Sequence, residues 1–287
     1  MQPIVSIITP CFNADKYLSE TLDCLQKQTL YDWECIIVND GSTDSSSDIA
    51  HEYAAKDSRY VVIDKENEGP SVARNVGIKA SHGKYILPLD ADDLIEPSYL
   101  ELAVDYLENC DDCKVVYCEG DYFGDKHGNL EWAIFKGYKS LLLQNSTFNA
   151  IVFKKQDALL IGGYDEKMRG YEDWDFVIRL LNGSNGVYQI PYCLFHYRKS
   201  DQHESVNDKA EKRHEEFCNY IYKKNLDLYI KFYGAPIFTL KSYTNLFDIL
   251  NWYAFWFHRT PVKIIRFFLK IYDKIRGVDN LNISKTY

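Results

Sequence analysis

Residues 85–93 read YILPLDADD, an apolar run that ends in three acidic side chains. Tyr85 to Leu89 has the length and character of a buried strand, so Asp90, Asp92 and Asp93 are expected at its carboxyl end. Hard divalent cations prefer carboxylate, water and phosphate oxygens, and this cluster therefore suits Mg²⁺ or Mn²⁺ shared with a diphosphate. The alternative is a solvated acidic turn that caps the next helix.

The segments before this run repeat the same strand-like pattern, with helical spacing of apolar residues between the repeats. The strand-like runs are Val5 to Thr9, Glu34 to Val38, Tyr60 to Ile63 and Tyr85 to Leu89. This alternation predicts an α/β fold with a mainly parallel, doubly wound sheet flanked by helices. Ligands of such sheets bind outside the carboxyl ends of the strands, and Asp40 and Asp90 are both expected there.

Composition limits the class of protein. A chain of 287 residues with 46% hydrophobic residues can form one α/β domain and an appendage, and a net charge of −9 argues against electrostatic binding of nucleic acid. Eight scattered cysteines form no disulfide framework, which indicates a reducing compartment. Cys110 and Cys113 form a Cys-x-x-Cys pair without a second pair or a histidine at zinc spacing, and their role stays open.

The N-terminal apolar run is too short, and too poor in flanking Lys or Arg, for a signal peptide. No apolar stretch reaches the length that spans a bilayer. We therefore expect a cytoplasmic protein.

Five motifs together resemble the family 2 glycosyltransferases of the GT-A fold. They are TPCFN at 9–13, NDGSTD at 39–44, the Asn67, Gly69 and Ala73-Arg74-Asn75 pattern, DADD at 90–93, and GGYDE at 162–166 leading to Glu172-Asp173-Trp174. The resemblance implies a Rossmann-like GT-A catalytic domain over residues 1–207, with nucleotide-sugar binding in its first half and the acceptor side in its second. It also implies an inverting enzyme that uses a UDP-sugar and a divalent metal.

The resemblance gives the carboxylates distinct roles on the donor. Asp92 would be the first metal ligand, and the cation would offset the charge that develops on the leaving diphosphate. Asp90 would face the ribose or the hydroxyls of the donor sugar. Asp40 would accept a hydrogen bond from the uracil ring, with an Asx turn as the alternative explanation.

The remaining donor-side residues are uncharged except for one arginine. Thr9 and Pro10 would form the first-strand side of the base pocket, Asn13 would shape the loop behind them, and Asn67 would contribute from the third strand's loop. Arg74 opens a helix, where a cation and free backbone N–H groups can meet an anionic nucleotide. A surface salt bridge is the alternative for Arg74.

Asp173 occupies the position that the family uses for the general base, at the start of a predicted helix. The helix dipole is expected to keep this carboxylate ionised near neutral pH. Glu172 could orient the acceptor. Trp174 could offer a stacking face to a sugar or simply pack in the core.

Family members often carry a histidine two residues after a Tyr-Arg pair, and it can complete the metal site. Here Lys199 and Ser200 follow Tyr197-Arg198, so the third ligand is in question. His203 is the favoured candidate over His196, and the alternative is that neither binds the metal.

Residues 208–287 are expected to form a helical C-terminal module. An aromatic stretch from Trp252 to Phe257 precedes a segment after Pro261 in which apolar residues share one face and basic residues another. The basic residues are Lys263, Arg266, Lys270 and Lys274. This pattern is typical of an interfacial anchor on the inner face of the membrane, which would favour a lipid-linked saccharide as acceptor in surface polysaccharide or glycolipid synthesis. Packing on the catalytic domain, or on a second subunit in a homodimer, is the alternative.

Two other classes of function compete with sugar transfer. A nucleotidyltransferase that makes sugar nucleotides would need a Gly-rich, Arg-bearing loop, and none follows the run from Ile4 to Thr9. A non-catalytic nucleotide- or carbohydrate-binding module would need neither the metal carboxylates nor the base.

Overall fold

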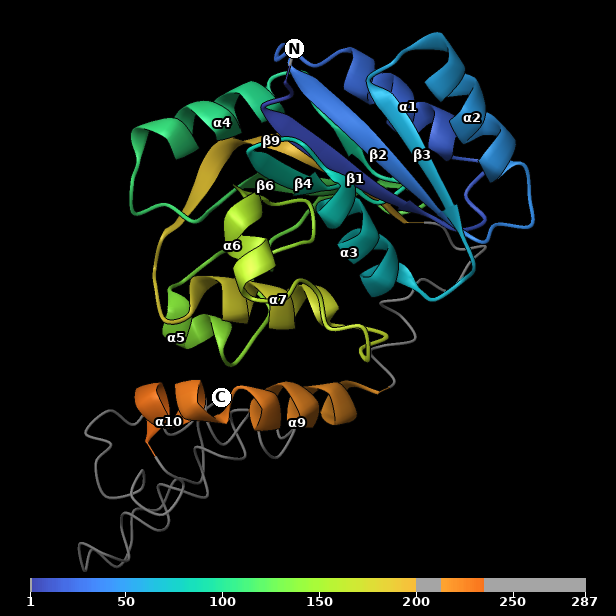
Figure 1. Ribbon diagram of the computed structural model, residues 1–287. Coiled ribbons are helices and arrows are strands. Elements are labelled where there is room, and N and C mark those ends of the chain that lie inside the picture. Colours follow the sequence, from blue (N-terminus) through green and yellow to red (C-terminus); the bar gives the residue numbers. More distant parts are fainter. Residues whose placement is uncertain (1, 200–212, 235–287) are drawn as a thin grey trace, which may run out of the picture. The chain divides into compact units, whose positions relative to one another are not determined.

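The computed structural model describes residues 2–199 and 213–234 (Figure 1). The chain divides into two compact units, Met1–Leu226 and Asp227–Tyr287. The first unit contains all the strands described below and nearly all of the helices. The second contributes most of α10 (Leu226–Tyr233) to the described residues.

The first half of the sheet is parallel. The strands β1 (Val5–Cys11), β2 (Trp33–Asp40), β3 (Tyr60–Lys65) and β4 (Tyr85–Pro88) stand in the order β3-β2-β1-β4. All three pairs in this order are parallel, as the alternating pattern predicts. Every residue of β2 and β4 is buried, which explains why these strands read as continuous apolar runs rather than as alternating ones.

The second half of the sheet mixes both directions. β4 pairs antiparallel with β8 (Val152–Lys154), and β8 pairs antiparallel with β6 (Val115–Gly124). β6 then pairs parallel with β9 (Val187–Lys199) and antiparallel with β7 (Gly128–Asn129), while β5 (Leu94–Ile95) lies antiparallel to β9 at the end of the sheet. The sequence pattern does not predict these pairings, because three of the strands have only two or three residues.

Helices cover both faces of the sheet (Figure 1). The helices α1 (Leu18–Gln26), α2 (Ser46–Lys56) and α4 (Tyr99–Asn109) lie on one side, and α3 (Pro70–Ala80), α6 (Lys155–Leu160) and α7 (Glu172–Leu181) on the other. The short α5 (Tyr138–Leu141) lies beside α7. In α1, Leu18, Leu22 and Leu25 are fully buried, and each contributes about 1.5–3 kcal/mol of hydrophobic stabilisation.

Hydrogen bonds tie together the loops at the carboxyl ends of β1, β2 and β4. Asn13, with a φ of 51°, accepts the backbone N–H of Thr43 at 2.8 Å, which joins the first loop to the second. The hydroxyl of Thr21 donates to the carbonyl oxygens of Ala91 and Asp93, each at 3.0 Å. The acidic loop after β4 is thus fixed to α1 by its backbone.

A buried carboxylate anchors α9 (His214–Lys224) to α7. Asp175 is fully buried and accepts hydrogen bonds from Arg179 Nε at 2.8 Å, Lys224 Nζ at 2.9 Å and Asn225 Nδ2 at 3.1 Å. Lys224 also pairs with Asp165 in the loop before α7. The helix α7, which carries Asp173, is therefore bonded through Asp175 to α9.

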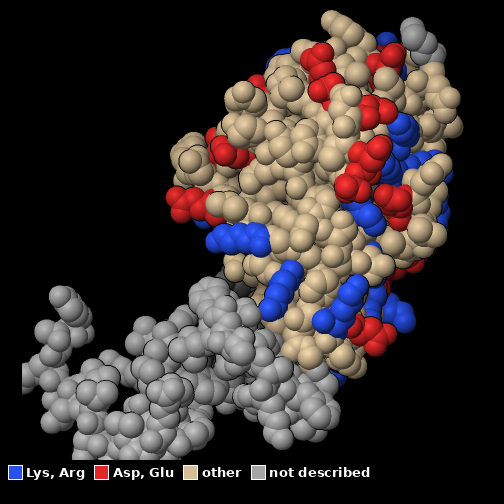
Figure 2. All heavy atoms as spheres, turned by 90° about the vertical axis from the view of Figure 1, so that its left-hand side faces the viewer, with Lys and Arg blue, Asp and Glu red and all other residues tan. Residues whose placement is uncertain are grey.

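Several expectations concern residues outside the described part of the chain. They are the predicted ligand His203, the stretch from Trp252 to Phe257, and the basic helix with Lys263, Arg266, Lys270 and Lys274. The predicted domain boundary at residue 207 also falls there and stays a prediction. Within the described residues, no helix is long and apolar enough to cross a membrane. On the face shown in Figure 2, Lys and Arg are interspersed with Asp and Glu and form no continuous basic field.

We predict that Asp175→Ala lowers the free energy of unfolding by about 3–5 kcal/mol, because it leaves two cations and an amide without their buried partner. Urea unfolding of the full chain measures the effect. Asp48→Ala, an exposed carboxylate on α2, is the control and should change stability by less than about 0.5 kcal/mol. Equal effects of the two substitutions would mean that the Asp175 network does not hold α9 to α7.

Candidate active site

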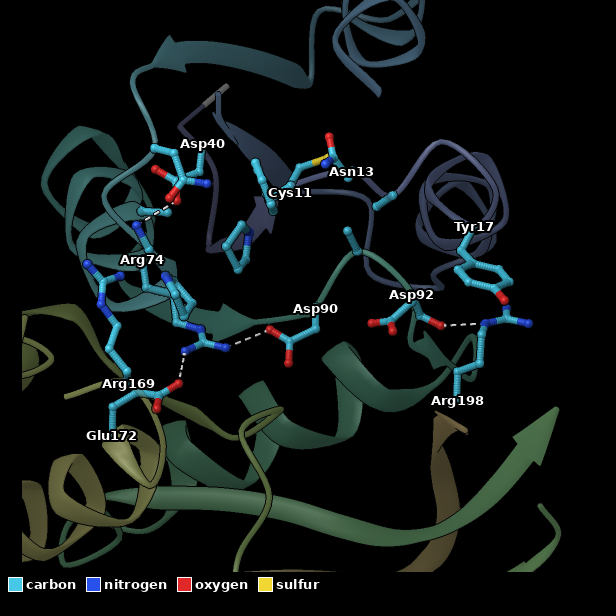
Figure 3. A pocket seen from close by; sticks show the side chains of 18 of the residues that line it. Cys11, Asn13, Tyr17, Asp40, Arg74, Asp90, Asp92, Arg169, Glu172 and Arg198 are labelled. Atoms are coloured by element: carbon cyan, nitrogen blue, oxygen red, sulfur yellow. Dashed lines mark hydrogen bonds and ion pairs between the residues drawn. The ribbon is translucent and has the colours of Figure 1, made fainter. Parts of the chain in front are cut away.

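A cavity of about 530 Å³ opens at the carboxyl ends of β1, β2 and β4 (Figure 3). Its volume lies in the range typical of small-molecule sites. Among its lining residues are Pro10, Asn13, Asp40, Asn67, Arg74, Asp90, Asp92 and Glu172, all of which the sequence singled out. The structure thus gathers side chains from the first 92 residues, from α7 and from the end of β9 around one space.

Asp40 is almost fully buried at the end of β2. It accepts hydrogen bonds from Lys65 Nζ at 2.7 Å and from the backbone N–H groups of Glu68 at 3.0 Å and Gly69 at 2.7 Å. Burial alone would raise the pKa of Asp40, but these three donors outweigh it and hold the pKa below its usual range. The cavity therefore has a permanently charged acceptor at this end.

Thr9 does not join the cavity wall. Its side chain is fully buried, with the hydroxyl 3.6 Å from the sulfur of Cys35, whereas the next residue, Pro10, lines the cavity. Side chains alternate along a strand, so the two neighbours cannot both face the same space. The side chain of Thr9 is therefore not among those that line the cavity, whereas Pro10, Asn13 and Asn67 are, and their contacts with a base stay predictions.

Arg74 forms a buried bridge between the two halves of the site (Figure 3). It donates to Asp90 at 2.8 Å and to Glu172 at 2.8 Å, and its side chain is only 6% exposed. Burial disfavours the charged guanidinium, yet the two carboxylates raise the pKa of Arg74 above its ordinary value. Arg74 lines the larger cavity as expected, but it is paired in a buried bridge rather than a surface one, and its contact with a nucleotide stays a prediction. Glu172, which the sequence suggested could orient the acceptor, is the second carboxylate of this bridge.

The acidic loop after β4 carries two carboxyls with strongly raised pKa values. Burial and the charge of Asp90 raise the pKa of Asp92 to about 6. Asp93 is buried, and burial together with the charges of Asp92 and Asp90 raises its pKa well above the ordinary value. It accepts the backbone N–H of Arg198 at 2.9 Å and so fastens the end of β9 rather than capping a helix.

This donor set fits a divalent cation. Asp90 and Asp92 both line the cavity, and their mutual repulsion raises the energy of the state in which both are ionised. A divalent cation bound between them would offset this repulsion. Arg198 supports the loop from the side, since its Nε donates to the carbonyl oxygen of Asp92 at 2.8 Å and its side chain pairs with Glu20. The guanidinium also lies over the rings of Tyr17 and Phe123, 4.5 Å and 4.1 Å from their centroids.

Asp173 lines a second, smaller cavity of about 70 Å³ that adjoins the first. The two cavities share Arg74, Asp90, Glu172 and Tyr197. Burial and the charge of Glu172 raise the pKa of Asp173 to about 7. The helix dipole therefore does not keep this carboxylate fully ionised near neutral pH, because burial outweighs it. A carboxyl that titrates near neutrality is well matched to accepting a proton.

The aromatic residues that line the smaller cavity include Trp132 but not Trp174. Trp174 is 2% exposed and its indole N–H donates to the carbonyl oxygen of Leu141 at 2.7 Å, so it packs in the core. Trp132 is 39% exposed and lines the cavity beside Asp173. Trp132 follows the short β7, and no motif marks it in the sequence.

The structure adds a cation that was not predicted and places the less favoured histidine candidate elsewhere. Arg169 lines the larger cavity and lies against Gly69, whose φ is 95°, and a Cβ at that position would come within 1.3 Å of Arg169 Nη1. Sequence reasoning missed this residue because it falls between the GGYDE motif at 162–166 and Glu172-Asp173-Trp174, outside both. His196 lines neither cavity but pairs with Asp121 and Glu96, so it does not complete the metal site at Asp92.

Comparison with known sequences assigns the chain to a family. The sequence profile described as Glycosyl transferase family 2 matches residues 6–164, more than half of the chain. An uncharacterized glycosyltransferase of Methanocaldococcus jannaschii is 30% identical over 275 residues, covering 86% of this chain and 94% of that protein. Two Bacillus subtilis relatives, EpsH and EpsJ, are 48% and 46% identical over 34% and 35% of the chain. These two matches span only 29% of the length of each relative.

Comparison with solved structures confirms the predicted GT-A fold. S. aureus TarS, crystallised with UDP-GlcNAc, aligns with a TM-score of 0.63 at 18% identity, over 88% of this chain and 79% of that one. The mannosyltransferase PcManGT from Pyrobaculum calidifontis, in complex with GDP-Man and Mn²⁺, aligns with a TM-score of 0.54 at 18% identity, over 70% and 59% of the two chains. At such identities the likeness concerns the fold alone.

We predict that Arg74→Ala lowers the free energy of unfolding by about 3–5 kcal/mol, because Glu172 is left buried without its partner. Adding Glu172→Gln should recover at least about 1 kcal/mol, since it removes the stranded charge. Lys84→Ala breaks the exposed pair with Glu108 and is the control, with an expected loss below about 1 kcal/mol. Urea unfolding of the three variants and the parent chain tests the bridge, and a double variant less stable than Arg74→Ala would contradict it.

Proposed function

The chain belongs to glycosyl transferase family 2, and from that premise we propose that it transfers a sugar from a UDP-sugar to a saccharide or lipid-linked saccharide with inversion at the anomeric carbon. One observation carries this proposal. A paired-carboxylate loop suited to a metal lies in a nucleotide-sized cavity, and a carboxyl with a pKa of about 7 lies in the adjoining cavity. The first arrangement suits a leaving diphosphate and the second an attacking hydroxyl.

The donor end of the proposal rests on Asp40 and its surroundings. An ionised carboxylate at the base of the cavity can accept the ring N–H of uracil, and Pro10 and Asn67 line the same space. TarS was crystallised with UDP and with UDP-GlcNAc, which supports a uridine donor. PcManGT was crystallised with GDP-Man, so the donor screen includes guanosine nucleotides.

Asp92, with Asp90 beside it, would hold the divalent metal, Mn²⁺ or Mg²⁺. When bound, such a cation neutralises charge on the departing diphosphate. Neighbouring residues hold these two carboxylates in fixed positions. Thr21 and Arg198 fix the backbone of the acidic loop, and Arg74 holds Asp90 toward the cavity.

The proposed reaction is a single displacement. An acceptor hydroxyl in the smaller cavity attacks the anomeric carbon from the face opposite to the diphosphate, its proton passes to the carboxylate of Asp173, and the bond from the sugar to the diphosphate breaks. Asn145 and the backbone N–H of Trp174 donate to Asp173 at 3.3 Å and 2.8 Å and orient it. Trp132 offers an apolar ring for the acceptor sugar to stack on.

The acceptor class follows from the sequence rather than from the described structure. The basic residues after Pro261 and the aromatic stretch before it favour attachment to an anionic membrane surface, where a lipid-linked acceptor for a surface polysaccharide or glycolipid would lie.

Isothermal titration of UDP and GDP, with and without Mn²⁺, tests the donor site. We expect Mn²⁺ to strengthen UDP binding in the parent chain. Asp92→Asn should weaken the Mn²⁺-dependent part by at least about tenfold, because an amide is a poorer ligand for a hard cation. Metal-free binding of uridine should persist in this variant, and Asp48→Asn should behave as the parent. An unchanged response to Mn²⁺ in Asp92→Asn would remove Asp92 from the metal site.

The base is tested by the pH dependence of UDP release from a UDP-sugar. Because a protonated carboxyl cannot accept a proton, kcat/KM should fall about tenfold per pH unit below about pH 7, the pKa of Asp173. Asp173→Asn should lower kcat on the order of a hundredfold to ten-thousandfold and leave UDP affinity unchanged. A parent profile that stays flat between about pH 5 and pH 8, or near-parental turnover in the variant, would exclude Asp173 as the base.

A further inference from the structure

A second cluster of metal-ligating side chains lies outside both cavities, on β6, β9 and the segment after β5. His196 has its Nδ1 2.7 Å from Asp121 and its Nε2 2.9 Å from Glu96. The sulfur of Cys193 joins them, since one ligand atom each from Asp121, Cys193 and His196 lie within 4.8 Å of one another. None of these residues lines the larger or the smaller cavity.

An irregularity in the sheet creates the cluster. Cys193 and His196 are three residues apart and would face opposite sides of a regular strand. Here Cys193 pairs with Glu119 and His196 with Asp121, because the pairing of β9 with β6 skips Leu194. The bulge therefore turns the thiol and the imidazole toward the same face, beside Asp121. Leu194 and Phe195 are consecutive and both buried, as a bulged strand allows.

The close approach of the two strands at this bulge requires a glycine at position 120. A Cβ on Gly120 would lie 2.9 Å from the carbonyl oxygen of Phe195, so only glycine lets β9 approach β6 at this point. Bulges recur where a side chain must be aimed at a particular target. Here the residues so aimed are all metal-ligating types.

The charges of the cluster favour a cation. Asp121 and Glu96 bring two carboxylates to one imidazole, with side chains that are 35%, 47% and 22% exposed for Asp121, Glu96 and His196. Burial works against the imidazolium, but the two carboxylates outweigh it and raise the pKa of His196. Burial and Asp121 raise the pKa of Cys193 to about 11. A positive ion would reverse that effect, because a coordinating thiol loses its proton to solvent.

We propose that Asp121, Cys193 and His196 bind a zinc-class transition-metal ion at a site separate from Asp90 and Asp92. The nitrogen Nδ1, on the side of Asp121, would coordinate, while Nε2–H donates to Glu96. That arrangement of carboxylate, histidine and metal is common around protein-bound zinc. Thiolate, imidazole and carboxylate with an open fourth position suit Zn²⁺ or Co²⁺, whereas the oxygen-only set at Asp92 suits Mn²⁺ or Mg²⁺.

The proposed ion would act on the active site through the sheet. Leu94 pairs with His196 and Ile95 with Phe195, and β5 follows directly after Asp93. Two residues beyond His196, Arg198 donates to the acidic loop. An ion that joins β6 to β9 would therefore restrain the strand against which this loop is fixed. The proposal does not depend on the proposed sugar transfer.

Co²⁺ titration of the metal-free, reduced full-length chain tests the site by absorption spectroscopy. A thiolate ligand gives an intense near-ultraviolet charge-transfer band, which an oxygen-only site cannot give. We expect the band in the parent chain, its loss in Cys193→Ser, and its displacement by Zn²⁺. Glu96→Gln should keep the band but weaken Zn²⁺ binding by about tenfold to a hundredfold, as the loss of a hydrogen-bonding partner of a ligand does.

Two control variants separate this site from its alternatives. Cys110→Ser should keep the band, which excludes the Cys-x-x-Cys pair as its source, and Asp92→Asn should keep it, which excludes the acidic loop. Absence of the band in the parent chain, its survival in Cys193→Ser, or its loss in Cys110→Ser would each overturn the proposal. Circular dichroism of each variant verifies that the conservative replacements leave the fold intact.

Discussion

The buried bridge from Asp90 through Arg74 to Glu172 is the interaction on which the rest of the site depends. Arg74 and Glu172 are 98 residues apart in sequence, yet their side chains meet at 2.8 Å inside the protein. Burying a guanidinium is costly, and only close carboxylates on both sides offset that cost. The loop after β4, the start of α3 and the start of α7 must therefore occupy fixed relative positions. Because the same three residues line both cavities, the geometry between the two cavities depends on this one cation.

Environment, rather than residue type, separates the roles of the carboxylates. Asp40 receives three hydrogen bonds and keeps its charge, whereas Asp92 and Asp173 lie where burial and a neighbouring carboxylate raise their pKa values to about 6 and about 7. Carboxyls whose surroundings push their pKa values apart are suited to different tasks. An ionised carboxylate at one end, a pair that suits a cation in the middle and a carboxyl with a pKa of about 7 at the other end follow from the packing of three loops.

The sequence pattern predicts the elements whose structure depends on residues close together in the chain. The four parallel strands and the turns bearing Asp40 and Asp90 could be placed because each is a short apolar run followed by polar turn residues. The helix start bearing Asp173 could be placed because apolar residues at helical spacing follow it. The mixed second half could not, since β5, β7 and β8 have two or three residues each and their pairing depends on distant partners. The sequence pattern also does not predict the orientation of single side chains. Trp174 is buried with its indole N–H bonded to α5, Trp132 is exposed, and the bonds of Arg74 involve residues far along the chain.

The strand β9 connects the two cavities to the outer cluster of Asp121, Cys193 and His196. Within a few residues it supplies His196 to the outer cluster, Tyr197 to both cavities and Arg198 to the acidic loop. Arg198 makes its contacts through a backbone N–H, a guanidinium nitrogen and two aromatic faces, so the position of the loop follows the position of the strand. A restraint on β9 anywhere near His196 is transmitted by covalent geometry over two residues, and it needs no long chain of packed side chains. A shift of β9 near His196 would therefore move Arg198, and with it the loop that carries Asp90 and Asp92.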